Sequence, residues 1–335
     1  MSWLPHQVVD HLREISRAPD LTGTKYRLVR ELARGGMGAV YLAEDPELNR
    51  QVALKVLHVV DPPGAGSGEV VRRMWREARI IARLEHPGIV PVHDVGELPD
   101  GRVFYVMKLV QGRRLDQYRQ SASPRSDLLR VFQKACEAVA FAHSQGVIHR
   151  DLKPENIMVG SFGEVLVMDW GVAKVLSVAA PESWPAGQSP EACGTQYGAV
   201  LGTPAYMAPE QARGQTDQID QRADVYALGG ILHFLLTGDT PRSAAAGQAR
   251  GGASPPRPLR AVCRKAMAQD PAERYPSAAE LSADVARFLD SLPVGAYREN
   301  LLERAWRVLS RNRMAVILIL AYLIMRLVLL FFSRR

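Results

Sequence analysis

Apolar and polar residues follow two different patterns along the chain, and the change divides it into two parts. Between residues 25 and 107, short apolar stretches such as 52–56 and 103–107 predict β-strands. From residue 112 onwards the apolar residues recur at helical spacing, most clearly over 127–144, which predicts an amphipathic helix. The pattern therefore predicts a small β-rich unit followed by a larger helical one, an α+β architecture.

Two further helices are predicted towards the ends of the chain. Residues 3–17 carry apolar side chains at helical spacing, which is typical of a short brace before the main domain. Residues 314–332 contain a single charge, Arg326, and are long enough to cross a hydrocarbon core of about 30 Å. A central arginine costs roughly 2.5–3.5 kcal/mol, which the other residues should outweigh. The alternative is a buried helix or one that lies on a membrane surface.

The formal charge of +7 is concentrated in the C-terminal segment. Residues 298–335 contain eight Arg and two Glu and so carry +6, which leaves the rest of the 335-residue chain near neutral. A nearly neutral body argues against binding to nucleic acid, and a basic segment beside an apolar stretch favours a juxtamembrane position. Because arginines are more numerous before residue 314 than after 332, we expect the N-terminal side to face the inside of the cell.

The cysteines and the N-terminus indicate a reducing compartment. The three cysteines, Cys136, Cys193 and Cys263, lack C-x-x-C spacing, so neither a disulfide framework nor a zinc site is expected. Residues 1–20 lack the long apolar run of a signal peptide. We therefore expect the N-terminal portion to remain in the cytosol, where ATP is available.

One polar stretch, residues 149–156, combines the groups that phosphoryl transfer needs. It contains a carboxylate at Asp151, a lysine at Lys153 and an amide at Asn156. A carboxylate can orient a hydroxyl group, a cation can lie near the moving phosphoryl group, and an amide oxygen can ligate Mg²⁺. Because all three lie on one loop, their side chains can converge on one point.

This stretch, His-Arg-Asp-Leu-Lys-Pro-Glu-Asn, resembles the catalytic loop H-R-D-L-x-x-x-N of the eukaryotic-type (Hanks-type) bacterial serine/threonine protein kinases. The resemblance implies that Asp151 is the catalytic base, that Lys153 lies beside the γ-phosphate and that Asn156 binds a metal ion. A second motif, Asp169-Trp170-Gly171, resembles the D-F-G of that family, which implies that Asp169 holds Mg²⁺ against the ATP phosphates. Trp170 replaces the family's Phe, which puts in question the packing that sets active and inactive states.

The same resemblance implies a nucleotide site in the β-rich unit. Lys55 is expected to bind the α- and β-phosphates and to pair with Glu77 on the following helix. A glycine-rich turn after residue 32 resembles the phosphate-binding loop, although Ala33 replaces its first glycine, and we expect a modest cost. ATP and Mg²⁺ (or Mn²⁺) are the implied cofactors. The positions expected to contact them are Leu32, Ala33, Arg34, Gly35, Gly36, Met37, Gly38, Val40, Ala53, Lys55, Glu77, Met107, Leu109, Asn156 and Asp169.

Residues 169–210 resemble a kinase activation segment that closes with Ala-Pro-Glu. Its phosphoacceptor candidates are Ser177, Ser183, Ser189, Thr195 and Tyr197, of which Thr195 is preferred, and Arg150 could pair with the added phosphate. By the same resemblance, Asp224 should cap the catalytic-loop backbone and Glu210 should pair with Arg274. The stretch over 239–258 is short where the family has a substrate-docking helix, which leaves substrate recognition open.

These observations predict a chain with four regions. They are a helical extension (1–24), a two-lobed protein-kinase domain (25–290, with an N-lobe over 25–107 and a C-lobe over 112–290), a basic juxtamembrane segment (291–313) and a transmembrane helix (314–332). The predicted function is ATP-dependent phosphorylation of Ser or Thr in protein substrates, at the cell inner membrane with the kinase domain facing the cytoplasm. Arg326 is compatible with pairing between two copies. The alternatives are a pseudokinase scaffold at the membrane and a small-molecule phosphotransferase, which the Ala-Pro-Glu segment fits poorly.

Overall fold

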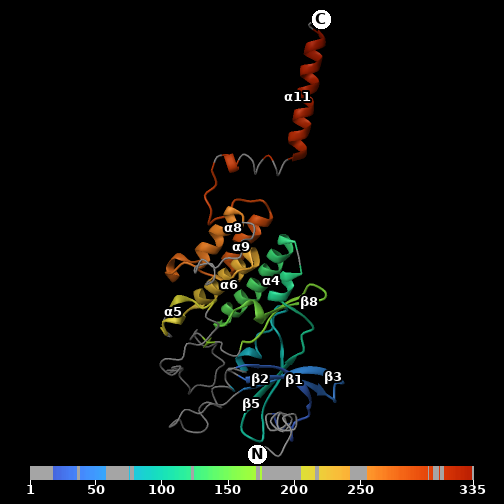
Figure 1. The fold of residues 1–335 in the computed structure, drawn as a ribbon, viewed down its shortest axis with the longest axis vertical. Coiled ribbons are helices and arrows are strands. Elements are labelled where there is room, and N and C mark those ends of the chain that lie inside the picture. The colour runs from blue at the N-terminus through green and yellow to red at the C-terminus, as the bar shows by residue number, and fades with distance from the viewer. Residues whose placement is uncertain are drawn as a thin grey trace, which may run out of the picture.

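The computed structural model has a lobe with a β-sheet and a mainly helical lobe, which follow one another along the chain (Figure 1). It describes residues 18–35, 38–57, 75, 79–121, 124–170, 174–175, 205–215, 219–241, 255–300, 302–304, 309 and 313–333. The helix predicted over 3–17 lies outside these residues. The two-lobed α+β architecture expected from the sequence is confirmed.

The small lobe is built on an antiparallel sheet. Its strands are β1 (Arg27–Gly35), β2 (Gly38–Asp45), β3 (Arg50–Leu57), β4 (Val92–Glu97) and β5 (Val103–Lys108), in the order β1-β2-β3-β5-β4. Because β3 pairs with both β2 and β5, Lys55 lies opposite Val40 on one neighbour and Tyr105 on the other. The register therefore places the predicted phosphate-binding lysine in the middle of the sheet.

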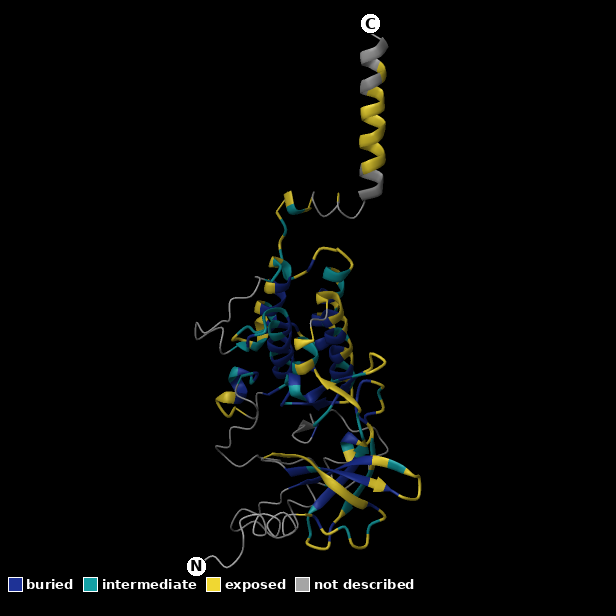
Figure 2. Cartoon of the chain, turned by 45° about the vertical axis from the view of Figure 1, so that its right-hand side comes forward, coloured by how far each residue is buried: buried dark blue, intermediate teal, exposed yellow. Residues whose placement is uncertain are grey.

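The edge strand β1 differs from the central strands in its burial. β1 is exposed along its whole length, whereas β3 is buried from Val52 to Leu57 (Figure 2). Shifts in the register with β2 fall between Leu28 and Arg30 and between Glu31 and Ala33. β1 therefore buries neither face, because it has a neighbour on one side only and the core of this lobe lies against the other strands.

The large lobe is built around α4 (Arg125–Ser144), α6 (Gln221–Thr237), α8 (Arg257–Ala266) and α9 (Ala278–Leu289), with the short helices α3 (Leu115–Gln120) and α5 (Pro209–Ala212). α4 buries one apolar stripe, as its spacing predicts. Asp220 caps the N-terminus of α6, where its carboxylate accepts from the Arg222 amide at 2.7 Å, and Gly238, which has a left-handed backbone (φ 88°), caps the C-terminus. The buried residues of α4 are Leu128, Leu129, Val131, Phe132, Ala135, Cys136, Ala138, Val139 and Ala142.

Short elements surround the predicted catalytic stretch. β7 (Val147–Ile148) precedes it and pairs with β10 (Lys174–Val175). The 3₁₀ turn η1 (Pro154–Asn156) closes it and continues into β8 (Ile157–Gly160). β8 pairs with β6 (Gly112–Arg114) and with β9 (Val165–Val167). The chain therefore returns to the end of the catalytic stretch just before Asp169.

The helical lobe continues past residue 290, the boundary predicted from the sequence. The buried Asp284 carboxylate on α9 accepts from the Gly295 amide at 2.8 Å, from the Ala296 amide at 3.0 Å and from the Tyr275 hydroxyl at 2.8 Å. Val294 is also buried in the core. The predicted boundary is therefore too early, because a carboxylate inside the lobe binds the backbone that follows α9.

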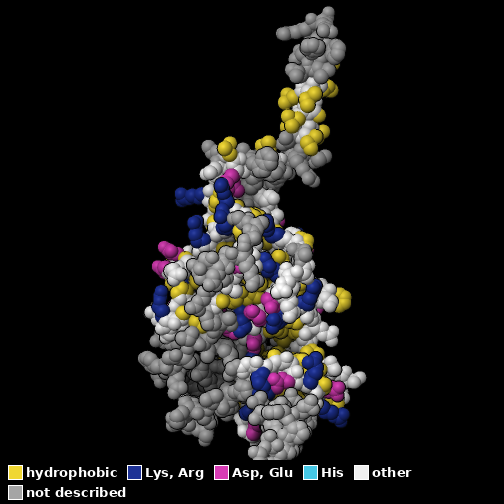
Figure 3. Space-filling model, viewed as in Figure 1, with side chains coloured by type: hydrophobic (Ala, Val, Ile, Leu, Met, Phe, Trp, Pro, Cys, Tyr) yellow, Lys and Arg dark blue, Asp and Glu magenta, His cyan; other side chains and the backbone are white. Residues whose placement is uncertain are grey.

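The C-terminal segment forms the helix α11 (Arg313–Ser333), which extends away from the lobes with its residues 317–326 exposed. Apart from Arg326, its exposed side chains lack charge and are mostly large and apolar, whereas charged side chains of both signs are interspersed over the described surface of the lobes (Figure 3). Within the part of the chain that the structure describes, no helix combines the length and the apolar character needed to cross a membrane. The membrane-spanning helix expected over 314–332 is therefore not supported.

A buried ion pair closes the helical lobe, as the sequence predicted. Arg274, which follows the turn η3 (Pro271–Glu273), donates to the Glu210 carboxylate at 2.7 and 2.8 Å. Its guanidinium also donates to the carbonyl oxygens of Ala268 at 2.8 Å and Arg222 at 3.0 Å. The charges are thus buried together with several hydrogen-bond partners, the condition under which a buried pair is tolerated.

We expect Arg274→Met to lower the free energy of unfolding by about 3–5 kcal/mol, because it leaves the Glu210 carboxylate buried without its cation. Urea denaturation followed by circular dichroism measures this loss. The matched control is Arg102→Met, which removes a more exposed pair with Asp100 (2.6 Å) and should cost no more than about 1 kcal/mol. Equal losses in the two variants would contradict a structural role for the Glu210–Arg274 pair.

Candidate active site

A buried carboxylate, Asp224 on α6, holds the backbone of the predicted catalytic loop. Asp224 is 1% exposed, and its carboxylate accepts from the amides of His149 at 2.8 Å and Arg150 at 2.9 Å. His143 Nε2 on α4 lies 2.8 Å from the same carboxylate. The predicted contact between Asp224 and the loop backbone is confirmed, and it supports the left-handed conformation of Arg150 (φ 69°).

The surroundings of Asp224 hold its pKa below the usual value for an aspartate. Burial alone would raise this pKa, but the hydrogen bond from His143, the charges of His143 and His149, and the His149 amide outweigh that effect. Asp224 is therefore ionised at neutral pH, and its charge is stabilised by hydrogen-bond donors from two separate segments, α4 and the catalytic loop.

The three predicted loop residues converge. Lys153 Nζ lies 2.9 Å from Asp151 Oδ2, and Asn156 Nδ2 donates to the Asp151 carbonyl oxygen at 2.8 Å. Asp151 and Asn156 are largely buried, and Lys153 is partly exposed. The Arg150 carbonyl oxygen accepts from Gln211 Nε2 on α5 at 3.0 Å, so the residue directly after the predicted activation segment also holds the loop.

Asp169 lies beside this loop and contacts the small lobe. The Met168 amide donates to the Asn156 carbonyl oxygen at 2.8 Å, which joins the two segments directly before Asp169. The Asp169 carboxylate forms an ion pair with the ammonium group of Lys55. Lys55 is 4% exposed on β3, while Asp169 is partly exposed. A residue from the sheet and one from the helical lobe thus meet at one point.

The two charged groups stabilise each other's ionised forms. Burial alone would lower the pKa of Lys55, but Tyr105 and Asp169 raise it above its usual value. Burial alone would raise the pKa of Asp169, but the Lys55 ammonium lowers it. Both groups are therefore ionised at neutral pH, as ligands for phosphate and for a cation must be.

The donor set fits a divalent cation that is shared with a phosphate. No cluster of three or more His, Cys, Asp or Glu side chains suited to a metal ion occurs among the described residues. Mg²⁺ is commonly held by one or two protein oxygens together with water and phosphate oxygens, so a complete protein cage is not required. The Asp169 carboxylate suits this role, and Asn156 has an amide oxygen in addition to the nitrogen that bonds to Asp151.

The predicted phosphate-binding turn joins β1 to β2. Ala33 pairs with Val40 and Gly35 pairs with Gly38. A side chain at Gly38 would collide with the carbonyl group of Val56, so the close approach of β3 requires glycine there. Leu32 and Arg34 lie on β1, whereas the predicted contacts Gly36 and Met37 lie outside the described residues.

Three further positions predicted to contact the nucleotide lie on the paired strands β3 and β5 or directly after β5. Ala53 lies directly opposite Met107, and Leu109 follows the end of β5. The predicted partner of Lys55, Glu77, lies outside the described residues. The structure therefore places the strand residues of the predicted nucleotide site together and leaves the Lys55–Glu77 pair a prediction.

Two residues that take part in the site were not identified from the sequence. His149 is fully buried, its Nε2 donates to the Met168 carbonyl oxygen at 2.9 Å, and its ring centroid lies 4.6 Å from that of Trp170. Tyr105 contributes to the pKa of Lys55 from the neighbouring strand. Alternation along 103–107 could have placed Tyr105 and Met107 on one face of β5, but the pairing partner of β5 is not evident from the sequence.

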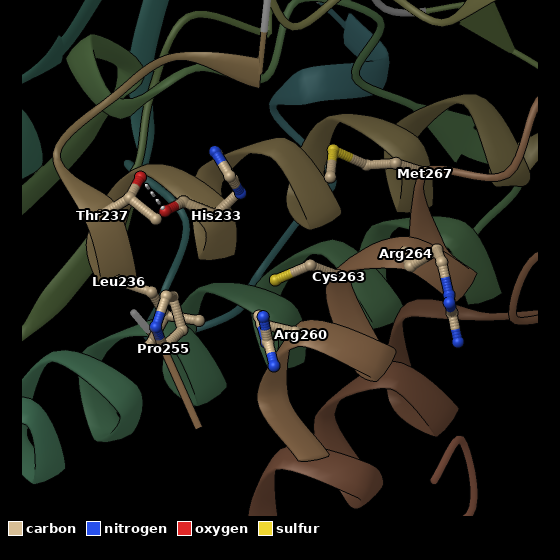
Figure 4. Close-up of a pocket in the computed structure, with 8 residues that line it drawn as sticks. All are labelled: His233, Leu236, Thr237, Pro255, Arg260, Cys263, Arg264 and Met267. Atoms are coloured by element: carbon tan, nitrogen blue, oxygen red, sulfur yellow. Dashed lines mark hydrogen bonds between the residues drawn. The ribbon is translucent and has the colours of Figure 1, made fainter. Parts of the chain in front are cut away.

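Two pockets lie in the helical lobe. A small one at the catalytic loop is lined by Arg150, Asp151, Leu152, Tyr206, Met207 and Ala227. A larger one, of about 350 Å³, lies between α6 and α8 and is lined by His233, Leu236, Thr237, Pro255, Arg260, Cys263, Arg264 and Met267 (Figure 4). None of the residues predicted for phosphoryl transfer lines the larger pocket, so volume alone does not locate the site.

We expect Asp224→Asn to lower the free energy of unfolding at neutral pH by about 2–3 kcal/mol, because an amide replaces a charged acceptor of several hydrogen bonds. The folded-state pKa is depressed, so this contribution is fully present above the unfolded value of 3.8 and is lost as the pH falls through the folded value. The difference from wild type should therefore shrink below pH 3.8.

Urea titrations over a series of pH values measure this difference for Asp224→Asn. Asp127→Asn, at an exposed position of α4, is the control and should stay within about 0.5 kcal/mol of wild type. A difference for Asp224→Asn that persists unchanged into acid would show that shape, and not charge, carries the effect.

Comparison with known proteins assigns a family to this geometry. The protein kinase domain family matches residues 26–294. The chain is 35% identical over 301 residues to the serine/threonine-protein kinase PknD of Protochlamydia amoebophila. The aligned region covers 79% of this chain and 30% of that protein. The chain is 39% identical over 294 residues to the serine/threonine-protein kinase PknB of Mycobacterium tuberculosis. Here the aligned region covers 82% of this chain and 44% of that protein.

A solved structure shows the same fold. The crystal structure of the M. tuberculosis PknI kinase domain matches with a TM-score of 0.58 and 30% identity, over 82% of this chain and 99% of that chain. The chain spans less than half the length of the two curated relatives. The family match and the identities nevertheless cover most of this chain, and the chain belongs to the protein kinase family, with bacterial serine/threonine-protein kinases as relatives.

Proposed function

We propose that the chain is an ATP-dependent serine/threonine protein kinase that transfers the γ-phosphoryl group of ATP to Ser or Thr hydroxyls of protein substrates. One observation carries the proposal: Asp151, Lys153 and Asn156 lie together on one loop, and the Lys55–Asp169 ion pair is joined to that loop through Met168. The names of the relatives support Ser or Thr in proteins as the acceptor.

Each residue has a role that its position suits. Lys55 would bind the nucleotide phosphates, and Asp169 and Asn156 would hold a divalent cation, Mg²⁺ or Mn²⁺, which neutralises the charge of the phosphates when it is bound. Asp151 would orient the acceptor hydroxyl and accept its proton, and Lys153 would stabilise the charge of the transferred group. Catalysis would then depend on positioning and electrostatics, because the protein forms no covalent bond to the phosphoryl group.

The Lys55–Asp169 ion pair indicates how the site accommodates a charged substrate. The two opposite charges satisfy each other. An anionic phosphate would bind Lys55 and a cation would bind Asp169, so each partner would exchange one counter-charge for another. The buried lysine is thereby never left without an anion, a condition that would be costly.

We also propose regulation through phosphorylation of the activation segment, with Thr195 as the preferred acceptor. Thr195 lies outside the described residues, and the support comes from Arg150. Its backbone is held by Asp224 and Gln211 directly beside Asp151. A phosphate that bound the Arg150 guanidinium would therefore order the segment next to the catalytic loop.

A third proposal is attachment to the cell inner membrane through the C-terminal helix, with one pass and with the kinase domain facing the cytoplasm. It is supported by the single charge between residues 314 and 332, by the arginines before it and by the exposure of residues 317–326. The guanidinium of Arg326 lies 5.8 Å from the centroid of the Tyr322 ring on the same helix. Pairing of two copies through Arg326 remains part of this proposal.

The central test is incubation of the purified full chain with labelled ATP and Mg²⁺. We expect label on Ser or Thr, and a loss of about 10²–10³-fold or more in Lys55→Met and Asp169→Asn, because the first removes the cation that would bind the nucleotide phosphates and the second removes the anionic ligand of the divalent cation. Lys25→Met, at an exposed lysine, should retain wild-type incorporation. Mass spectrometry of the labelled chain tests Thr195.

Absence of incorporation in the wild type, with ATP still binding, would favour the pseudokinase scaffold. Ala33 and Trp170 would then be the departures from the family pattern to explain. Label on a small-molecule acceptor instead of a protein would favour the metabolite phosphotransferase.

Membrane attachment is tested by comparing the full chain with a chain that ends at residue 312. We expect the full chain to stay with the membrane fraction after a wash in alkaline carbonate and the shorter chain to be released, because residues 314–332 supply the apolar contact. Release of the full chain by carbonate but not by salt would indicate a helix that lies on the membrane surface. Release of both chains by buffer alone would contradict attachment.

A further inference from the structure

Trp170 is the residue directly after Asp169, and it is packed into the core of the helical lobe. It is 3% exposed and belongs to the same hydrophobic cluster as Ile89, Phe132 and Leu228. Its ring centroid lies 4.6 Å from that of His149, with an angle of 51° between the rings. Packing of this kind needs only an aromatic ring of suitable size.

Trp170 also makes a contact that a phenylalanine cannot make. Its indole Nε1 donates a hydrogen bond to the Val167 carbonyl oxygen at 3.2 Å, in a buried position. Indole has an N–H donor, whereas the phenyl ring has no polar atom. The tryptophan at this position therefore adds a directional contact to an apolar one.

The acceptor of this hydrogen bond lies at a junction between distant segments. The same Val167 carbonyl oxygen accepts from the Val90 amide at 3.3 Å, and the Val167 amide donates to the Gly88 carbonyl oxygen at 2.8 Å. Residues 88–90 precede β4, so β9 is joined here to the chain that enters the small lobe. The indole attaches residue 170 to this junction.

Asp169 lies inside the loop that the indole hydrogen bond closes. Its backbone is left-handed (φ 66°), a conformation that is uncommon for residues other than glycine and that the surroundings must hold in place. On one side, Met168 is held by hydrogen bonds at its amide (to the Asn156 carbonyl oxygen, 2.8 Å) and at its carbonyl (from His149, 2.9 Å). On the other side, the indole hydrogen bond ties residue 170 back to residue 167.

We propose that Trp170 is a positioning residue, whose indole N–H, bonded to the Val167 carbonyl, holds Asp169 in the orientation that faces Lys55. The inference deepens the proposed function and rests on it, because it concerns the carboxylate assigned to the divalent cation. It assigns to the tryptophan a task beyond filling the core. A phenylalanine would keep the packing against His149 but lose the hydrogen bond, so Asp169 would depart from this orientation more often.

The test compares Trp170→Phe with Phe132→Leu in the full chain. Phe132 is fully buried on α4 in the same hydrophobic cluster and has no role in the proposed site, so Phe132→Leu perturbs the core without removing the indole hydrogen bond. Amide hydrogen exchange of the ligand-free chains is the first measurement, and the Mg²⁺ dependence of ADP binding by calorimetry is the second. Neither measurement requires catalytic turnover.

In Trp170→Phe we expect the amides of residues 168–170 to exchange about fivefold faster, the change that corresponds to one neutral hydrogen bond. We expect the Mg²⁺ concentration needed for half-maximal ADP binding to rise about threefold to tenfold. In Phe132→Leu any faster exchange should be spread over the helical lobe, with the Mg²⁺ dependence unchanged. A Trp170→Phe chain that behaves like Phe132→Leu in both measurements would overturn the proposal.

The two proposals fail in different ways. A wild-type chain that binds no ADP at any Mg²⁺ concentration would refute the proposed function. The exchange comparison would still decide whether the indole hydrogen bond holds residues 168–170, because it is made on the ligand-free chain. Faster exchange confined to these residues supports the positioning role, and its absence overturns it.

Discussion

The buried Asp224 carboxylate is the interaction on which the arrangement of the site depends. An isolated charge in the core of a protein is costly, and here it is balanced by two backbone amides and a histidine. Because the amides belong to His149 and Arg150, the condition that stabilises the charge also determines the path of the catalytic loop. The flanking α6 residues Val225 and Leu228 are fully buried, so the carboxylate itself has little freedom to move.

From this point the contacts continue outward to the small lobe. The loop carries Asp151, Lys153 and Asn156, and the Asn156 carbonyl oxygen holds the Met168 amide. Asp169 then meets Lys55, which the pairing of β3 with β2 and β5 places in the middle of the sheet. The site is thus a chain of hydrogen bonds and one ion pair that ends on a residue of the other lobe, and both lobes are needed to complete it.

Two other sites of buried charge follow the same principle. Glu210 and Arg274 neutralise each other, Arg274 also donates to backbone carbonyl oxygens, and Asp284 accepts from the amides that follow α9. Each joins segments that are distant in sequence or lie beyond the end of a helix, and each has its hydrogen bonds satisfied. The indole of Trp170 is a neutral example, since it joins the residue after Asp169 to the β9 carbonyl that also binds residue 90.

Much of the fold was predictable from the sequence, because it depends on periodicity and on local motifs. The strands between 25 and 107, the helix over 127–144 and the loop over 149–156 lie where their patterns predict. The contacts of Asp224 with the loop and of Glu210 with Arg274 were also predicted, by resemblance to a family. The boundary at residue 290 was wrong, because the buried carboxylate that binds the backbone beyond α9 belongs to no local pattern.

By itself, the sequence determined which residue types are available and which of them lie on one loop, because spacing along the chain controls proximity over a few residues. It could not determine that β1 would be exposed on both faces, that Lys55 would bond to Asp169, or that Trp170 would donate to Val167. These features depend on strand register, on the approach of one lobe to the other and on the direction of a single N–H group. Only the tertiary structure decides them, since each requires segments that are independent in sequence to be placed within hydrogen-bonding or packing distance.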